Sequence, residues 1–130
     1  MDIQLLELPK ITDERGDLTF LEENIGLPFQ MKRIFWTYDL KTHSKRGGHA
    51  YKTQNEVISV VSGSADLVVK YRDNTEEQIK LNRADQGIYI PAQVWRHLEN
   101  FATNTVLLHI SDSDFNEDDY IRDLNQFLDG

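Results

Sequence analysis

The sequence predicts an all-β fold, a sandwich or a barrel, with one short helix near the C-terminus. Short runs rich in β-branched and aromatic residues follow one another along most of the chain, and turn-forming residues separate several of them. A helical spacing of apolar residues begins after residue 113. The length of 130 residues is enough for one sizeable hydrophobic core, so we expect a single domain over residues 1–130.

The predicted strands are the short runs of apolar, β-branched and aromatic residues. In chain order, these runs cover residues 3–8, 17–23, 31–39, 56–63, 65–72, 76–81, 87–93 and 105–111. We also place residues 46–52 on a strand and expect a further strand to start near His97. Turn-forming residues lie at 24–28, 62–64 and 73–74. The last of these turns predicts a hairpin, and many short strands at regular spacing indicate a sandwich or a barrel.

The C-terminal segment has a different period. Its apolar residues recur at the spacing of one helix face and are Tyr120, Ile121, Leu124, Phe127 and Leu128. This pattern predicts a helix over about residues 116–128. Acidic residues crowd the start of the segment, where the dipole of a helix favours negative charge.

Composition and charge exclude several classes of function. The chain has no cysteine, which excludes disulfides, thiolate metal sites and a cysteine nucleophile. The net charge is −8, of which residues 112–129 contribute −6, and this disfavours nucleic-acid binding. A small anionic ligand is compatible with it, because a few arginines beside a pocket set the local potential. The chain begins without signal-peptide features and has no run of ~20 apolar residues, so we expect a cytoplasmic protein that enters no membrane.

The stretch RGGHAYKTQNEVISVVSG, residues 46–63, carries the candidate catalytic residues. On a strand, His49 and Tyr51 point to the same face because they are two residues apart. Glu56 opens the next predicted strand and can return to that face. A barrel would bring these side chains, and His97 from a later strand, around one interior cavity. Imidazole suits proton transfer there, because its pKa lies near the working pH.

The same stretch resembles the first motif of the cupins, a glycine-led H-x-H followed by E and G at fixed spacing. The chain matches this motif at His49, Tyr51, Glu56 and Gly63. It matches the second cupin motif at Gly87, Pro91 and His97. The resemblance implies a cupin double-stranded β-helix, which is a jelly-roll-like barrel, followed by the short C-terminal helix.

A narrower resemblance covers nearly the whole chain. The segments that carry it are ERGDL (14–18), EEN (22–24), LPFQMKRIF (27–35), RGGHAYK (46–52), LNRADQGIYIPAQVW (81–95) and DDYIRDLNQFL (118–128). They resemble the dTDP-4-keto-6-deoxyhexose 3,4-ketoisomerases, cupins of deoxysugar biosynthesis that move a keto group between neighbouring sugar carbons. The resemblance implies an isomerase that needs no metal and no cofactor. It also implies a dTDP-linked 4-keto-6-deoxyhexose as substrate, and a homodimer.

One position departs from the family pattern. The ketoisomerases carry histidine at both positions of H-A-H-K, whereas this chain has Tyr51 at the second. A phenol with a pKa of ~10 has to lose its proton before it binds a metal well, so the change argues further against a metal site. Tyr51 either takes over the role of the second histidine or marks a branch with another substrate.

The resemblance assigns catalysis to His49 and Tyr51. His49 is expected to act as the base that removes the proton from C3 of the sugar, and Tyr51 as an oxyanion donor or proton relay. Glu56 is expected either to orient these side chains or to take part directly. His97 is expected to lie in the same cavity.

The diphosphate of such a substrate favours arginine, whose planar paired donors match its oxygens. Arg15 and Arg46 are the main candidates for this contact, and Arg33 and Lys52 are further ones. Trp95 is a candidate for stacking on the thymine base.

Three other functions are also compatible with the sequence. A binding module would retain recognition of the nucleotide sugar but would have lost turnover through Tyr51. A related dTDP-sugar epimerase would use the same carbanion chemistry. A metal-dependent cupin oxygenase would hold a metal in the cavity. The remaining histidines, His43 and His109, are expected to be structural.

Overall fold

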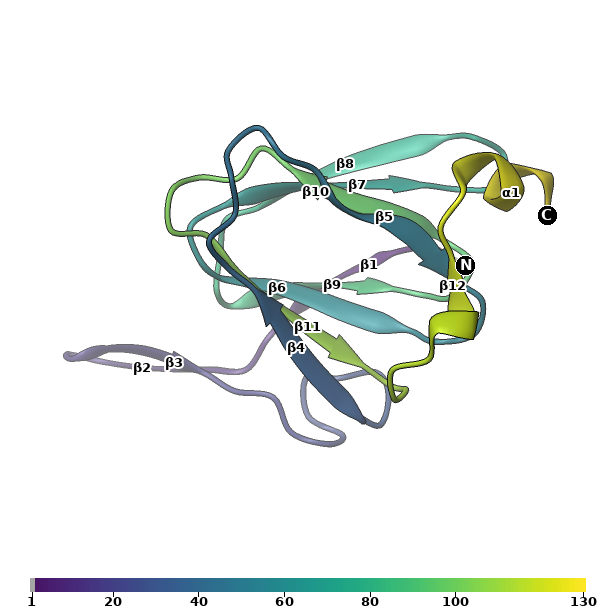
Figure 1. Cartoon of the computed structure of the whole chain (residues 1–130). Helices are drawn as coiled ribbons and strands as arrows, with labels where there is room; N and C mark the ends of the chain where they lie inside the picture. Colours follow the sequence, from purple (N-terminus) through teal and green to yellow (C-terminus); the bar gives the residue numbers. More distant parts are fainter. Residues whose placement is uncertain (1) are drawn as a thin grey trace.

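The structure is a computed structural model that describes residues 2–130. Two five-stranded sheets face each other across the interior, and every strand pair in them is antiparallel (Figure 1). This arrangement confirms the predicted all-β fold with one short C-terminal helix.

Most successive strands of the chain belong alternately to the two sheets. The first sheet has the order β1-β9-β6-β11-β4, with β1 (Gln4–Glu7), β4 (Arg33–Thr37), β6 (Glu56–Ser62), β9 (Gln86–Ile90) and β11 (Val106–Ser111). The second has the order β12-β5-β10-β7-β8, with β5 (Arg46–Tyr51), β7 (Ala65–Lys70), β8 (Glu76–Leu81), β10 (Trp95–Glu99) and β12 (Tyr120–Ile121). From β4 onward the chain alternates between the sheets, except at the β7–β8 hairpin, as in a jelly-roll-like barrel.

A third pair of strands lies apart from the barrel. β2 (Lys10–Asp13) and β3 (Gly16–Thr19) form an antiparallel ribbon that projects away from the sheets (Figure 1). The sequence predicted one strand here, over residues 17–23, and missed β2. All four residues of β2 are exposed, so this strand has no buried face to give it an apolar pattern.

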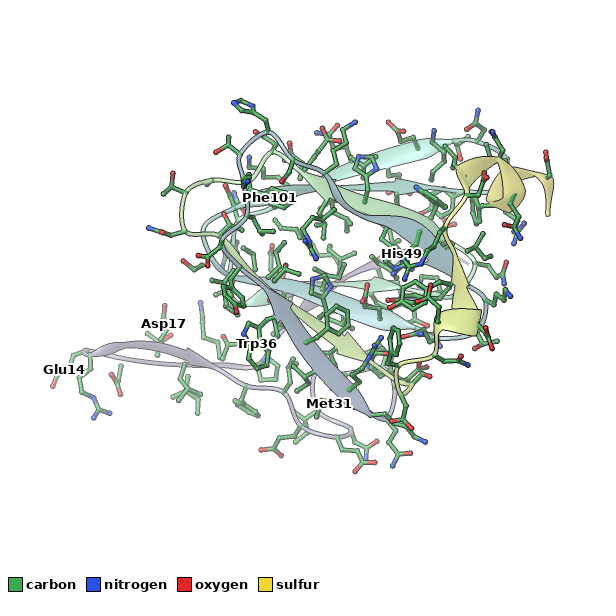
Figure 2. All side chains as sticks on the ribbon, viewed as in Figure 1. Glu14, Asp17, Met31, Trp36, His49 and Phe101 are labelled. Carbon is green, nitrogen blue, oxygen red and sulfur yellow. The ribbon has the colours of Figure 1, made fainter. Side chains whose placement is uncertain are left out.

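The main hydrophobic core fills the space between the inner faces of the two sheets. Two of the strands that contribute to it, β6 and β7, each contain five consecutive buried residues. The core includes Ile58, Val60, Leu67, Val69, Ile88, Ile90, Leu98, Phe101 and Leu107. Burial of each such side chain contributes roughly 1.5–3 kcal/mol. Phe101 lies near one end of the barrel and His49 lies toward the other, so the core occupies only part of the interior (Figure 2).

The predicted β7–β8 hairpin is confirmed, and its turn is explained by two residues. The Asp73 carboxylate accepts a hydrogen bond from the backbone N–H of Thr75 at 3.0 Å, and Asn74 adopts a left-handed conformation with φ of 70°. The predicted turn at residues 62–64 precedes this hairpin. Gly63 has φ of 78° there, and an added Cβ would lie only 2.7 Å from the Thr105 backbone, so glycine is required.

The C-terminal segment corrects the predicted helix over residues 116–128. It forms a 3₁₀ turn (Glu117–Asp119), the strand β12 and then the helix α1 (Leu124–Asp129). Tyr120 pairs with Tyr51 of β5, so this part of the chain is extended rather than helical. Pairing with β5 at the edge of the second sheet therefore decides the backbone conformation here, although the spacing of the apolar residues fits a helix.

Asp119 anchors this segment to the loop that follows β5. Its buried carboxylate accepts hydrogen bonds from the backbone N–H groups of Thr53 and Gln54, at 3.0 and 3.1 Å. The helix α1 then begins at Leu124, and the side chain of Asp123 caps it by accepting hydrogen bonds from the backbone N–H groups of Asn125 and Gln126. Phe127 of α1 is fully buried against the outer face of the second sheet. Neither helical segment within residues 2–130 has the length and apolar character that crossing a membrane requires.

Candidate active site

A cavity of about 220 Å³ lies between the two sheets, beside β12. Strands β5, β10 and β12 line it from one sheet, and β4, β6 and β11 line it from the other. Its polar lining includes His49, Tyr51, Glu56, Arg96, His109 and Tyr120. Both sheets therefore contribute titratable groups to one enclosed space, and Figure 2 shows His49 at this end of the barrel.

The strand β5 presents His49 and Tyr51 to this cavity, as the alternation of side chains predicted. The alternate residues of β5, Gly48 and Ala50, lie on the opposite face, and Ala50 packs there in an apolar cluster with Trp95. The ring of His49 lies 4.6 Å from that of Tyr51 and 5.0 Å from that of Tyr120, between centroids. The Nε2 atom of His49 is buried and has no hydrogen-bond partner among the described residues.

The environment of His49 keeps its imidazole neutral. Burial, followed by the positive charge of Arg96, lowers the pKa of His49 from 6.5 to about 3. Glu56 opposes this shift but does not overcome it. This value corrects the expectation that the pKa of the His49 imidazole lies near the working pH: the imidazole is neutral but a weak base, and its unpartnered Nε2 atom is open to a bound ligand.

This lowered pKa predicts a loss of stability in acid. We expect the free energy of unfolding to fall as the pH drops from 6.5 to about 3, because the unfolded chain protonates His49 in this window and the folded chain does not. The contribution of this one group is at most about 1.4 kcal/mol per pH unit. Urea unfolding at a series of pH values measures it, and the His49→Asn variant should show a shallower slope. Equal slopes for the two proteins would contradict the prediction.

Tyr51 is held as a neutral hydroxyl group. Burial raises the pKa of its phenol, and the charge of Glu56 and the contact with Tyr120 raise it further. Its hydroxyl donates to the hydroxyl of Tyr120 at 3.4 Å. The guanidinium of Arg96 lies 4.8 Å from the Tyr51 ring centroid. Tyr51 can therefore donate a hydrogen bond to a developing oxyanion but is not suited to act as a base.

Glu56 and Arg96 form an ion pair that is completely enclosed. Arg96 Nη1 donates to Glu56 Oε1 at 2.8 Å, and both side chains are at most 2% exposed. Arg96 also donates to the backbone carbonyl of Val94 through Nε and Nη2. Burial alone would raise the pKa of Glu56, but the contact with His109 and the charge of Arg96 outweigh it and lower the pKa. Glu56 is therefore an ionised carboxylate within the cavity wall.

The strand β10 corrects two of the predicted site residues. His97 was expected in the cavity, but the cavity is lined by its neighbours Arg96 and Leu98. His97 points to the other face of β10, where its Nε2 lies 2.5 Å from Glu99. Trp95, the candidate for thymine stacking, is on that same outer face and is buried against Phe127 of α1. Trp95 is therefore a core residue in this structure.

Three of the predicted diphosphate contacts are not in the cavity lining. Arg15 lies in the turn of the projecting β2–β3 ribbon and pairs with Asp13 at 2.7 Å. Arg33 donates a hydrogen bond to the Gln54 side chain at 3.2 Å, and its guanidinium lies 4.8 Å from the ring centroid of the cavity residue Phe35. Lys52 is exposed after the end of β5. The chain therefore does not bring these three side chains to its own cavity.

Arg46 does line the cavity, and the structure adds Arg122 to it. Both arginines are exposed, and Arg122 pairs with Glu117 at 2.7 Å while its guanidinium lies 4.1 Å from the Tyr120 ring centroid. The stretch YIR (120–122) belongs to a segment that carries the family resemblance, and no site role was predicted for it. Pairing of β12 with β5 is what brings Tyr120 and Arg122 beside Tyr51.

The cavity lining includes two histidines and one glutamate, which are residue types that can ligate a metal ion. Within residues 2–130, the His, Asp and Glu side chains form no group of three or more that could hold a metal ion.

Comparison with known proteins gives consistent results. The family model described as FdtA, WxcM-like, C-terminal matches residues 1–130. The TDP-4-oxo-6-deoxy-alpha-D-glucose-3,4-oxoisomerase of Aneurinibacillus thermoaerophilus is 31% identical over 127 residues, which are 98% of this chain and 91% of that protein. A 3,4-ketoisomerase of Helicobacter canadensis is 36% identical with a TM-score of 0.94, over 99% of this chain and 96% of that one.

A further similar structure contains a bound nucleotide sugar. It is a histidine-to-asparagine variant of QdtA, a 3,4-ketoisomerase of Thermoanaerobacterium thermosaccharolyticum, in complex with TDP-4-keto-6-deoxyglucose. It is 31% identical to this chain with a TM-score of 0.94, over 98% of this chain and 91% of that one. These similarities extend over the complete barrel and its cavity rather than over a single motif.

Proposed function

Because the chain belongs to the FdtA, WxcM-like C-terminal family, we propose that it is a dTDP-sugar 3,4-ketoisomerase. The reaction is the conversion of dTDP-4-keto-6-deoxyglucose into a dTDP-3-keto-6-deoxyhexose. The observation that carries the proposal is the neutral, unpartnered imidazole of His49 beside the un-ionised phenol of Tyr51 in one cavity. Neither a metal nor a cofactor is part of the proposed chemistry.

The proposed mechanism is a base-catalysed tautomerisation. His49 Nε2 removes the proton from C3, the C–H electron pair forms a C3=C4 double bond, and the C4 carbonyl pair moves onto its oxygen. Tyr51 donates a hydrogen bond to this developing oxyanion, because its phenol keeps its proton. Return of a proton to C4 and formation of the C3 carbonyl complete the isomerisation.

The proposed position of the substrate follows from the size of the cavity. Pockets that enclose a whole drug-sized ligand have volumes of roughly 300–1,000 Å³. The cavity of about 220 Å³ is smaller, so we assign it to the hexose ring and place the nucleotide outside it. Arg46 and Arg122 are exposed residues of the cavity lining and are suited to the diphosphate.

The test is incubation of the protein with dTDP-4-keto-6-deoxyglucose in deuterated water, followed by NMR. The proposal predicts a 3-keto product. Binding without product or exchange of the C3 proton would instead indicate a binding module, and a product inverted at a ring carbon would indicate an epimerase. Stoichiometric metal in protein purified without chelator would reopen the metal-dependent oxygenase.

The proposal includes a homodimer that covers the outer face of the first sheet. Three large apolar side chains on the outer face of this sheet are 45–58% exposed, namely Ile34, Trp36 and Val61. The projecting ribbon adds the cross-strand pair Ile11 and Leu18, at 58% and 56% exposure. An isolated two-stranded ribbon is marginally stable in water, so a second copy of the chain is the partner we assign to these surfaces.

Sedimentation tests this assignment. We expect the mass in solution at micromolar concentration to be twice the 15.1 kDa of the chain. The Trp36→Glu variant should sediment as a monomer, because a charge at the centre of an apolar interface is not compensated. A monomeric mass for the unmodified protein would contradict the proposed dimer.

A further inference from the structure

The cavity contains a second imidazole that the mechanism above does not use. His109 is on β11, in the sheet opposite the one that carries His49, and it lines the same cavity. It is 6% exposed, and its Nε2 atom is buried without a hydrogen-bond partner among the described residues. The sequence suggested a structural role for His109. A buried polar atom with no partner next to a cavity points instead to a ligand.

Two contacts fix the orientation of this imidazole. Its Nδ1 faces Glu56 Oε2 at 3.5 Å, and its ring stacks on Phe35 with centroids 4.5 Å apart and planes 7° apart. Glu56 is itself held by Arg96 at 2.8 Å. An ionised carboxylate can only accept hydrogen bonds, so its position beside Nδ1 favours the tautomer of His109 that carries its hydrogen on Nδ1 and its lone pair on Nε2. A carboxylate that orients an imidazole in this way is a common arrangement for a histidine that accepts protons.

The isomerisation requires a second proton transfer besides the one between carbons. The substrate carries a hydroxyl at C3 and a carbonyl at C4, and the product carries the reverse. One proton therefore has to leave the C3 oxygen and one has to reach the C4 oxygen. His49 is occupied with the carbon-bound proton, and the phenol of Tyr51 keeps its own proton because its pKa is raised, so it does not readily pass a proton from one oxygen to the other.

We infer that His109, oriented by Glu56, carries the proton between the two sugar oxygens. This inference rests on the proposed ketoisomerase function. His109 is then a catalytic residue, and Glu56 is a positioning residue that acts through it. Tyr51 stands where the resembling enzymes have a histidine, and His109 supplies a second imidazole from the opposite wall of the cavity.

All protons and electron pairs are accounted for over one turnover. His49 takes the C3 proton, the C–H pair becomes the C3=C4 bond, and the carbonyl pair moves to the C4 oxygen. His109 Nε2 takes the proton of the C3 hydroxyl and gives it to the C4 oxygen. The C3 oxygen pair then forms the C3 carbonyl, and the C3=C4 pair takes the proton of His49 at C4. Both histidines return to their starting states, and no co-reactant is consumed.

The test compares two rates in the His109→Gln variant, product formation and exchange of the C3 proton with deuterated water. Glutamine has a similar volume and fills the slot against Phe35, but it does not transfer a proton. We expect product formation to fall ~10²-fold and C3 exchange to fall less than about tenfold, because His49 is intact. Product formation within about threefold of the unmodified rate, or an equal fall in both rates, would overturn the inference.

Controls separate this result from folding and from the proposed function. Binding of TDP by the variant shows that it is folded, and the matched control His43→Gln removes an exposed loop histidine and should leave both rates unchanged. In a His109→Ala variant, added imidazole should restore product formation, whereas a failure of rescue at saturating imidazole would count against proton transfer. If the unmodified protein gives neither exchange nor product, the proposed function itself fails.

Discussion

A His49→Asn variant should lose product formation by ~10²–10⁴-fold, the usual contribution of a positioned general base. The reason is that His49 offers the unpartnered nitrogen that receives the carbon-bound proton. Exchange of the C3 proton should fall by the same factor, since no other group is assigned to that proton. This equal fall distinguishes His49 from His109, for which the two rates are expected to separate.

Substrate binding provides the control for the His49 variant. The affinity for TDP should stay within about threefold of the unmodified value, because the nucleotide is placed outside the cavity. Isothermal titration with TDP measures this affinity, and the His43→Asn variant serves as the matched substitution of an exposed histidine. Retention of more than about a tenth of the turnover by His49→Asn would contradict the assignment of the base.

An Arg96→Met variant should lose about 3–5 kcal/mol of unfolding free energy, the cost of leaving one partner of a buried ion pair alone. Glu56 is 1% exposed and Arg96 is its partner at 2.8 Å, so the substitution leaves an uncompensated carboxylate in the interior. Urea unfolding at neutral pH and fixed protein concentration measures the loss. A change below about 1 kcal/mol would show that water or another group compensates Glu56.

The double variant Arg96→Met with Glu56→Gln is the matched control for the ion pair. It removes both charges and should be more stable than Arg96→Met alone. The pH dependence has a defined direction as well. The pKa of Glu56 is lowered from 4.5 in the folded chain, so its contribution to stability is present above pH 4.5 and is lost as the pH falls through the lower folded-state pKa.

The sequence alone predicted the placement of those site residues that depends only on the alternation of side chains along a strand. His49 and Tyr51 share a face because they are two apart on β5, and Glu56 begins β6 with its side chain in the same cavity. The β7–β8 hairpin followed from its turn residues. These features need only the period of a strand and the chemistry of a turn.

The errors arose where the outcome depends on partners distant in the chain. A shift of one residue changes the face of a strand, and the motif directed attention to His97 although Arg96 is the residue that faces the cavity. The role proposed for His109 depends on its contact with Glu56, which lies on the neighbouring strand β6 and far away in the sequence. The spacing of Tyr120 and Ile121 fits a helix, and only pairing with β5 makes that segment extended.

Asp119 has a consequence for how this site can change. Its carboxylate holds the C-terminal segment in place through the loop at Thr53 and Gln54, and it is not among the residues that line the cavity. The neighbouring side chains Tyr120 and Arg122 do line it. Asp119 therefore holds the segment to the barrel, whereas the nearby residues Tyr120 and Arg122 face the cavity. Altered sugar preference can therefore be sought by randomising position 120, while Asp119 keeps the C-terminal segment attached to the barrel and Arg122 is retained for the diphosphate.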